Sequence, residues 1–414
     1  MNIILVKPNG KTNQYGDLAK YSAIEPPIWH AILANYYKVT AIVDAEALNL
    51  STIGTIKEIE EKNPDKVIIL ATGSHPSAFI QQKEESEKLK KKLDFLKIDC
   101  EILDKLPISP VKWGPPRWDL LPMDKYRCHN WHSWTNNSET SPYGVVYTSL
   151  SCPFKCNFCT VHNFYGNTFE QRTIEDIIAD FETFHKMGVK NIKIMDELFI
   201  FSPGRVHLIC DEIIKRWGDY FNIWAYARID IMNEELLKKM RKAGIRWLAY
   251  GIESGNDAIR KDALKGSFTK EKIKEVIKMT QNNDICVIGN FMFGFWDDTL
   301  ETMLETYDLA RKLECEYINF YCVVAYPDTP LYEEMKSLNV ALPVTWEQYS
   351  QLSADFLPLR TKDLEASQVL LFRDIVFKGY LKDFEYLYML KQKFGEKVVD
   401  EITSLTSIKI NRIC

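Results

Sequence analysis

Apolar positions in the first quarter of the chain fall in short runs that are separated by longer mixed segments. The runs at residues 3–6, 39–43 and 66–71 have the length and β-branched content of buried strands. The mixed segments predict helices at residues 28–37, 55–62 and 81–96. Strands that alternate with helices predict a parallel sheet with helices on both faces. We therefore expect a Rossmann-like domain over residues 1–105.

The pattern breaks down over residues 106–140, which contain five prolines and four tryptophans. Proline at this density excludes a regular helix or a central strand. The segment is also too aromatic for a flexible linker. We predict a connector that packs against both neighbouring parts of the chain.

Strand and helix patterns alternate again over residues 141–335. The predicted strands are residues 144–149, 191–195, 222–228, 247–251, 286–293 and 317–324. The predicted helices between them are residues 174–187, 206–217, 233–243, 270–282 and 300–313. Six such units predict a partial (β/α)6 barrel, whose chemistry lies at the C-terminal ends of the strands. The remaining residues, 336–414, are predicted to be mainly helical.

The composition is that of an ordinary globular chain, with 46% hydrophobic and 26% charged residues among 414. The net charge of −5 offers no basic face, so nucleic acid is not an expected partner. No apolar run approaches the roughly 20 residues of a membrane helix. The N-terminus lacks the pattern of a secretory signal. We expect a cytoplasmic protein with no membrane attachment.

Three of the ten cysteines, Cys152, Cys156 and Cys159, lie within eight residues, directly after the first predicted barrel strand. Three thiolates in one loop can bind three irons of a cubane cluster and leave the fourth iron without a protein ligand. The alternative is a structural zinc site, which needs a fourth ligand, and His162 is the candidate. Disulfides are not expected in a reducing compartment.

The spacing CxxxCxxC, with the aromatic Phe158 before the last cysteine, resembles the signature of the radical S-adenosylmethionine superfamily. The resemblance implies a [4Fe-4S] cluster on the three cysteines and S-adenosylmethionine on the open iron. It also implies an external electron donor such as flavodoxin or ferredoxin.

Motifs at the ends of later strands continue the resemblance in the expected order. They are MDE at 195–197, WAYARID at 224–230, GIESG at 251–255, NFMFGFWDDT at 290–299 and YPDTPLY at 326–332. In the family, such positions contact the amino, carboxylate, ribose and adenine parts of S-adenosylmethionine. The resemblance therefore assigns to this cofactor Phe158, Asp196, Glu197, Arg228, Glu253, Ser254 and Asn290.

The N-terminal domain resembles the cobalamin-binding domain of one subgroup, many of whose members are methyltransferases. Its strand-end turns would contact cobalamin through Pro8, Asn9, Asp44, Glu46, Thr72, Gly73, Ser74 and His75. The chain has no Asp-x-His-x-x-Gly motif to supply an axial histidine. Only about 35 residues separate Ser77 from Trp113, so the domain is truncated at its last strand–helix units.

The resemblance implies a cobalamin-dependent C-methyltransferase that acts through a 5′-deoxyadenosyl radical on an unactivated carbon of a small-molecule or sugar-type substrate. The alternatives are a cobalamin-independent radical enzyme for epimerisation, dehydrogenation or rearrangement, and a non-catalytic metal-binding module. Cys322, on the last strand, would be a hydrogen-atom donor or a buried small hydrophobe. No other catalytic residue is identified.

Overall fold

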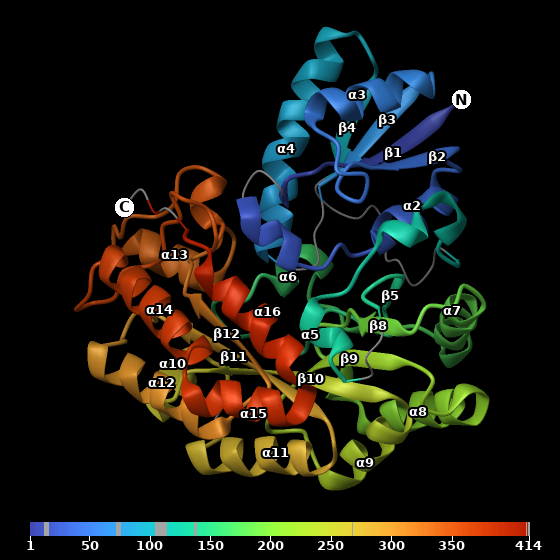
Figure 1. The fold of residues 1–414 in the computed structure, drawn as a ribbon. Coiled ribbons are helices and arrows are strands. Elements are labelled where there is room, and N and C mark those ends of the chain that lie inside the picture. Colours follow the sequence, from blue (N-terminus) through green and yellow to red (C-terminus); the bar gives the residue numbers. More distant parts are fainter. Residues whose placement is uncertain are drawn as a thin grey trace.

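The computed structural model of the chain describes residues 1–11, 16–71, 76–103, 114–135, 139–266, 268–410 and 412, and its N-terminal part is a parallel sheet (Figure 1). The strands, in the order β2-β1-β3-β4, are β1 (Ile3–Lys7), β2 (Ala41–Asp44), β3 (Lys66–Leu70) and β4 (Cys100–Leu103). Helix α2 (Ile28–Tyr36) covers one face, and α3 (Thr52–Glu61) and α4 (Pro76–Phe95) cover the other. This division of the helices follows from right-handed crossovers. The connection from β1 to β2 crosses the sheet in one direction, whereas the connections from β2 to β3 and from β3 to β4 cross it in the other, so their helices lie on opposite faces.

The predicted sheet is confirmed, but it has one more strand than the sequence indicated. The edge strand β4 is only four residues long, too short for its alternation to stand out. Helix α3 begins earlier than predicted because the Ser51 hydroxyl accepts a hydrogen bond from the Gly54 N–H at 3.2 Å and caps the first turn.

The larger part of the chain is an open six-stranded parallel sheet, in the order β12-β11-β10-β9-β8-β5. Its strands are β5 (Tyr143–Val146), β8 (Asn191–Ile194), β9 (Asn222–Ala227), β10 (Ile245–Glu253), β11 (Cys286–Phe293) and β12 (Tyr317–Cys322). The helices that follow its strands are α7 (Ile174–Lys186), α8 (Pro203–Trp217), α9 (Glu234–Lys242), α10 (Asp257–Asp262), α11 (Lys270–Asn282), α12 (Leu300–Leu313) and α13 (Pro330–Ser337). The expected fold class, a Rossmann-like domain followed by a partial (β/α)6 barrel, is confirmed.

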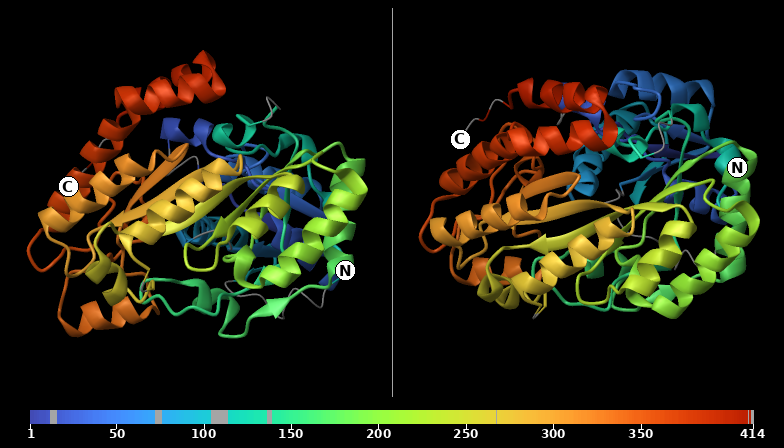
Figure 2. Two further views of the ribbon diagram at one scale, coloured as in Figure 1. Left: turned by 90° about the horizontal axis from the view of Figure 1, so that it is seen from below. Right: turned by 60° about the horizontal axis from the view of Figure 1, so that its bottom comes forward.

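The C-terminal region is helical, as expected, and lies along the open edge of the barrel beside β12 (Figure 2). Its helices are α14 (Ala366–Leu381), α15 (Phe384–Phe394) and α16 (Glu396–Ser407). None of the described helices is long and apolar enough to cross a membrane.

The strand predicted at residues 144–149 ends earlier, at Val146. From Thr148 the backbone N–H donates to the Asp196 carboxylate at 2.6 Å instead of to a neighbouring strand. The chain then leaves the sheet and forms the short antiparallel pair β6 (Ser149–Leu150) and β7 (Glu170–Gln171). This departure carries the cysteine loop out over the end of the barrel.

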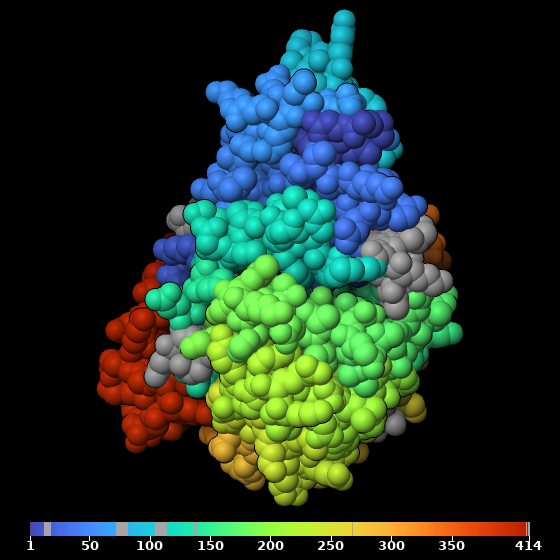
Figure 3. Space-filling view, turned by 90° about the vertical axis from the view of Figure 1, so that its right-hand side faces the viewer, coloured from blue at the N-terminus to red at the C-terminus, as the bar shows by residue number. Residues whose placement is uncertain are grey.

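The described part of the connector, residues 114–135, lies between the N-terminal domain and the barrel helices (Figure 3). It forms the short elements η3 (Trp118–Leu120), η4 (Met123–Lys125) and α5 (Asn130–Ser133). Trp118 packs on Phe184 of α7, with ring centroids 5.0 Å apart, and the Tyr126 hydroxyl donates to Asp44 at 2.9 Å. The connector therefore contacts both neighbours, as its composition predicts.

Two glycines that follow barrel helices differ in what surrounds them. Gly188 and Gly244 both have the left-handed backbone conformation, with φ of +72° and +86°. A Cβ on Gly188 would meet open space, whereas a Cβ on Gly244 would overlap the backbone carbonyl of Phe221. The close approach lets the chain enter β10 directly beside β9.

We predict that Gly244→Ala destabilises the protein more than Gly188→Ala. Both changes place a side chain in a left-handed conformation, at a cost of roughly 1–2 kcal/mol. Only Gly244→Ala adds an overlap with backbone atoms, which costs about 1–3 kcal/mol more. Thermal unfolding should show the lower midpoint for Gly244→Ala, and equal midpoints would contradict the packing argument.

Candidate active site

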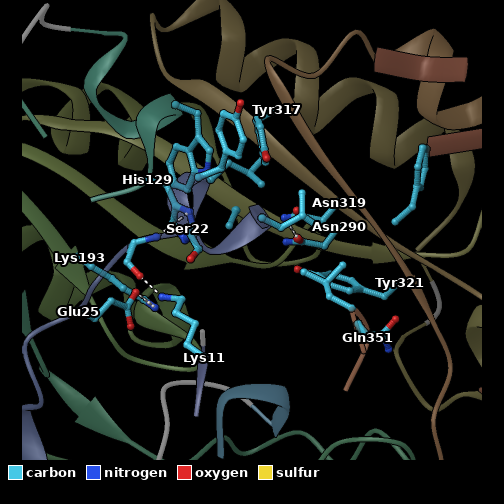
Figure 4. Close-up of a pocket in the computed structure, with 18 of the residues that line it drawn as sticks. Lys11, Ser22, Glu25, His129, Lys193, Asn290, Tyr317, Asn319, Tyr321 and Gln351 are labelled. Carbon is cyan, nitrogen blue, oxygen red and sulfur yellow. Dashed lines mark hydrogen bonds and ion pairs between the residues drawn. The ribbon is translucent and has the colours of Figure 1, made fainter. Parts of the chain in front are cut away.

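A pocket of about 620 Å³ lies where the C-terminal ends of the two parallel sheets meet (Figure 4). Lys7 and Glu46 enter it from the ends of β1 and β2, and Met195 and Glu253 from the ends of β8 and β10. The aliphatic residues Leu405, Ile408 and Ile410, from α16 and the segment after it, form another wall. The volume is typical of a site for a small-molecule ligand.

The cysteine loop reaches this pocket through Phe158 and Cys159. Cys152, Cys156 and Cys159 are unbridged and partly exposed. Burial raises the pKa of Cys152, and it raises the pKa of Cys159 to about 11. These two groups therefore stay protonated thiols until a metal replaces the proton.

Two buried cations lie beside the cysteine loop. The Arg228 guanidinium stacks on Phe154, 3.7 Å from the ring centroid, and is held by Asp230 at 2.8 Å. The Lys265 ammonium lies 2.8 Å from a Glu253 carboxylate oxygen. Burial lowers the pKa of Lys265, but the nearby carboxylate of Glu253 is the main cause that offsets this and leaves that pKa above its usual value. Two cations, each with a carboxylate partner, thus lie next to the loop.

His162, the candidate fourth zinc ligand, bonds within the loop instead. Its Nε2 lies 2.9 Å from the Phe154 carbonyl oxygen and its Nδ1 lies 3.2 Å from the Gly166 carbonyl oxygen. Among the described residues, no three His, Cys, Asp or Glu side chains converge as one metal ion requires. The single-zinc alternative therefore lacks its geometry, whereas a cubane takes one thiolate at each of three irons.

The predicted S-adenosylmethionine residues separate into two groups. Phe158, Glu253 and Asn290 line the pocket. Glu253 is turned into it by a register shift of β10 against β11 and by a left-handed backbone with φ of +64°. Such a bulge re-aims one side chain at the end of a strand.

The second group consists of Asp196, Ser254 and Arg228, whose polar side chains bond to other groups of the protein. Asp196 is fully buried and accepts bonds from the Thr148 backbone N–H and the Ser149 hydroxyl, both at 2.6 Å. Ser254 is also fully buried, and its hydroxyl accepts a bond from the Asn256 N–H at 3.1 Å. Neither residue lines the pocket, and neither does Arg228.

Glu197 is a partly buried residue whose carboxyl group lacks a full set of partners. Burial raises its pKa to about 8, with Asp196 adding to the effect, and its Oε2 has no partner among the described residues. It lies beside Tyr165, whose hydroxyl is 3.0 Å from that of Tyr147. Trp29 of the N-terminal domain packs on Tyr147, with ring centroids 4.6 Å apart.

The predicted cobalamin residues are dispersed. Glu46 lines the main pocket, but Asp44 is buried and bonds to Tyr126 and to the Ala47 N–H. Pro8 and Asn9 line a separate pocket of about 260 Å³ between the β1 turn and α3. The remaining predicted cobalamin contacts are not among the residues that the structure describes; they are Thr72, Gly73, Ser74 and His75.

Several polar residues of the pocket were not predicted from the sequence. Lys193 of β8 pairs with Glu25 of the N-terminal domain at 2.8 Å, although its side chain is 3% exposed. A lysine inside an otherwise apolar strand was the signal that could have indicated it. Asn319 of β12 donates to Asn290 at 2.9 Å (Figure 4). Cys322, which the sequence did indicate as a candidate, lines the pocket, and burial raises its pKa to about 11.

Comparisons with known proteins identify the part of the chain that contains the cysteine loop and most of the barrel. Residues 146–310 match the Radical SAM superfamily. The chain is 30% identical over 251 residues to an uncharacterized methyltransferase of Pyrococcus horikoshii, covering 60% of this chain and 50% of that protein. It is 24% identical over 303 residues to bacteriochlorophyllide d C-8(2)-methyltransferase of Chlorobaculum tepidum, covering 70% and 65%. The chain spans about half the length of the curated relatives that it matches first.

Two solved structures share the fold across both domains. The methyltransferase TsrM from Kitasatospora setae, solved with cobalamin and a [4Fe-4S] cluster, has a TM-score of 0.61 at 14% identity, covering 83% of this chain and 76% of that one. The cobalamin-dependent radical enzyme OxsB has a TM-score of 0.60 at 12% identity, covering 98% and 78%. These likenesses include the N-terminal sheet as well as the barrel.

We predict that Glu197→Gln flattens the dependence of stability on pH. A folded-state pKa of about 8, above the unfolded value, means that the folded protein holds an extra proton between pH 4.5 and 8. Its contribution is present below the unfolded pKa and is lost as pH rises towards 8, by at most roughly 1.4 kcal/mol per pH unit. From pH 6 to pH 8, the thermal midpoint should fall more for the unaltered protein than for the variant. Parallel changes would show that Glu197 ionises freely.

Proposed function

Since residues 146–310 form a radical S-adenosylmethionine domain, we propose that this protein is a cobalamin-dependent radical C-methyltransferase for a carbon of a small-molecule substrate. The observation that carries the proposal is the shared pocket: Cys159 and Glu253 of the barrel and Lys7 and Glu46 of the N-terminal sheet line one cavity. A methyl group that passes from one cofactor to a substrate activated by another needs both cofactors on one enclosed space.

Cys152, Cys156 and Cys159 would hold the cluster. Their fit rests on three unbridged, partly exposed thiols beside the buried cations Arg228 and Lys265. These cations offset the charge that thiolates and a cluster place in a largely desolvated loop. An external electron donor such as flavodoxin or ferredoxin would reduce the cluster, in the reducing cytoplasm.

Phe158, Glu253 and Asn290 would contact S-adenosylmethionine directly, because they line the pocket next to Cys159. The unpartnered Oε2 of Glu197 is an acceptor suited to an ammonium group. The planar Arg228 guanidinium can donate two hydrogen bonds to the carboxylate of S-adenosylmethionine. Asp230, which is partly exposed and now pairs with Arg228, would be displaced by that carboxylate. Asp196 and Ser254 would shape the strand ends around the cofactor.

Cobalamin would lie against the N-terminal side of the pocket, at Lys7, Glu46, His30 and Gln82. Its fit rests on these polar side chains at the end of a parallel sheet, where the fold leaves its binding crevice. When bound, the cluster supplies an electron to cleave S-adenosylmethionine, and cobalamin supplies the methyl group. The chain itself orients both cofactors and excludes water with Trp29, Trp131 and the wall from α16.

We predict that anaerobic reconstitution gives about four irons per chain and a protein that cleaves S-adenosylmethionine to methionine and 5′-deoxyadenosine. Replacement of Cys152, Cys156 and Cys159 by alanine should abolish both, because each thiolate binds one iron. Iron analysis and chromatography of the nucleoside products measure the two results.

Cys100→Ala is the matched control, since this cysteine lies on β4 and lines neither pocket. It should keep both the iron and the cleavage. Iron retained by the triple variant would remove the cluster from this loop.

We predict that the full chain retains about one cobalamin after loading with hydroxocobalamin and desalting. Paramagnetic resonance of the reduced cob(II)alamin form should show no nitrogen splitting from a protein histidine. The reason is that the sequence has no Asp-x-His-x-x-Gly motif to supply such a histidine. Of the pocket histidines, His30 donates Nε2–H to the Val6 carbonyl at 3.2 Å and its Nδ1 has no partner among the described residues, so His30→Ala is the variant that would identify the source of any splitting. Nitrogen splitting would contradict this, and cleavage of S-adenosylmethionine without cobalamin retention would favour a cobalamin-independent radical enzyme.

A further inference from the structure

The lysines that enter the pocket from its N-terminal side each lie near a carboxylate. The Lys193 ammonium lies 2.8 Å from Glu25, on one side of the pocket (Figure 4). Lys7 and Lys11 both reach Glu46, at 3.6 and 3.4 Å. These ammonium groups are therefore already compensated by carboxylates of the protein.

The opposite wall has two guanidinium groups but a single carboxylate between them. Arg373 and Asp374 of α14 line the pocket, and Arg412 reaches Asp374 from the C-terminal segment. The Arg412 Nε donates to Asp374 Oδ2 at 3.2 Å, and its Nη2 donates to Oδ1 at 3.5 Å. Lys378, about one turn further along α14, also lines the pocket and is exposed to solvent. Among the described residues, this wall therefore has more positive than negative charge.

Arg373 is the guanidinium whose hydrogen bonds are incomplete. Its side chain is only 4% exposed, and its Nη2 donates to the Gln351 carbonyl at 3.3 Å. Its Nε lies 3.0 Å from Asp374 Oδ1, but the two are not aligned, and Nε has no hydrogen-bond partner among the described residues. A buried donor without an acceptor costs free energy. Because Asp374 is hydrogen-bonded to Arg412, Arg373 lacks an aligned carboxylate acceptor of its own.

Gln351 holds this arginine at the end of β12. Its side-chain amide accepts a hydrogen bond from the Cys322 N–H at 3.1 Å and donates one to the Cys322 carbonyl at 2.9 Å. Its backbone carbonyl accepts from Arg373, and from Arg412 at 3.2 Å. Figure 4 shows Gln351 on the side of the pocket opposite Lys193. The surplus positive charge is thus fixed at one wall, away from the compensated lysines.

The neighbouring part of this wall is polar but uncharged. Tyr317, Tyr321 and Tyr326 line it. Beside them, Asn319 donates Nδ2–H to the Asn290 Oδ1 at 2.9 Å (Figure 4). Aromatic faces and amides suit the non-ionic part of a ligand. The ionic group of a ligand is therefore selected by the arginine cluster.

We propose that the substrate carries a carboxylate, and that this group binds the Arg373 guanidinium. The proposal rests on the proposed function, which makes this pocket the substrate site. The incoming carboxylate would take the place beside Arg373 that Asp374 Oδ1 now holds, while Asp374 keeps its bond to Arg412. A planar guanidinium donates two parallel hydrogen bonds to such a group. The two buried arginines and Asp374 leave one positive charge, which a carboxylate balances, whereas a phosphate monoester carries about −1.5 to −2 near pH 7.

Isothermal titration calorimetry of the cluster-loaded full chain tests this with three probes that share a phenyl ring. They are 3-phenylpropanoate, its uncharged analogue 3-phenylpropanamide, and 2-phenylethyl phosphate. We expect 3-phenylpropanoate to bind about tenfold or more tightly than the amide, because its hydrogen bonds to Arg373 are charge-assisted. It should also bind more tightly than the phosphate.

Two variants of the arginine cluster should change the affinity in opposite directions. Arg373→Gln should weaken 3-phenylpropanoate about tenfold or more and change the amide less than about twofold. Asp374→Asn should tighten 3-phenylpropanoate about three- to tenfold, because it removes the carboxylate that competes for Arg373. Such a gain cannot come from a misfolded protein.

Lys382→Gln is the matched control. It also removes one positive charge, from an exposed residue directly after α14 that lines neither pocket. It should change the affinity for each probe less than about twofold.

Binding of the amide or the phosphate as tightly as 3-phenylpropanoate would overturn the proposal, as would no binding of 3-phenylpropanoate. An unchanged affinity for 3-phenylpropanoate in Asp374→Asn would also overturn it. Cleavage of S-adenosylmethionine by the same preparation keeps the two proposals distinct. Cleavage together with any of these results refutes the carboxylate substrate alone, and no cleavage refutes the proposed function.

Discussion

The structure depends on the meeting of two parallel sheets at their C-terminal ends. In such sheets the loops that lead from each strand to the next helix all lie at the C-terminal ends of the strands, so the polar residues of these loops gather there. The buried Lys193–Glu25 pair joins the two ends directly, and the Tyr126–Asp44 bond joins the connector to the N-terminal sheet. Because of these contacts, residues from chain positions as distant as Lys7 and Cys322 line one pocket.

Burial of so many charges explains the character of that pocket. Removing one partner from a buried ion pair costs about 3–5 kcal/mol, because the other charge is left without compensation. Lys7 therefore lies beside Glu46 and Lys193 beside Glu25, so the ammonium and carboxylate groups on this side of the pocket offset one another. The cations beside the cysteine loop are paired as well, Arg228 with Asp230 and Lys265 with Glu253. They lie next to the Cys152 and Cys159 thiols, whose pKa burial raises.

The motif residues show how strand geometry divides roles between neighbours in the sequence. Where a strand ends, the backbone bends and neighbouring residues face different surroundings, so one enters the pocket and the next supports the loop. Glu253 lines the pocket while Ser254 bonds to the next turn, and Met195 lines it while Asp196 holds the chain before the cysteine loop. A sequence motif therefore shows which strand end borders the pocket, but it does not show which of its residues lines the pocket.

The sequence by itself determined the order of strands and helices, the fold class and the cysteine loop, because these follow from local periodicity and from spacing along the chain. It did not reveal β4, whose four residues carry too little pattern, or the early end of β5, which depends on Asp196 some fifty residues later. Only the tertiary structure decided which polar groups share the pocket. The pairing of Lys193 with Glu25 and of Asn319 with Asn290 joins distant segments, and nothing local in either segment specifies its partner.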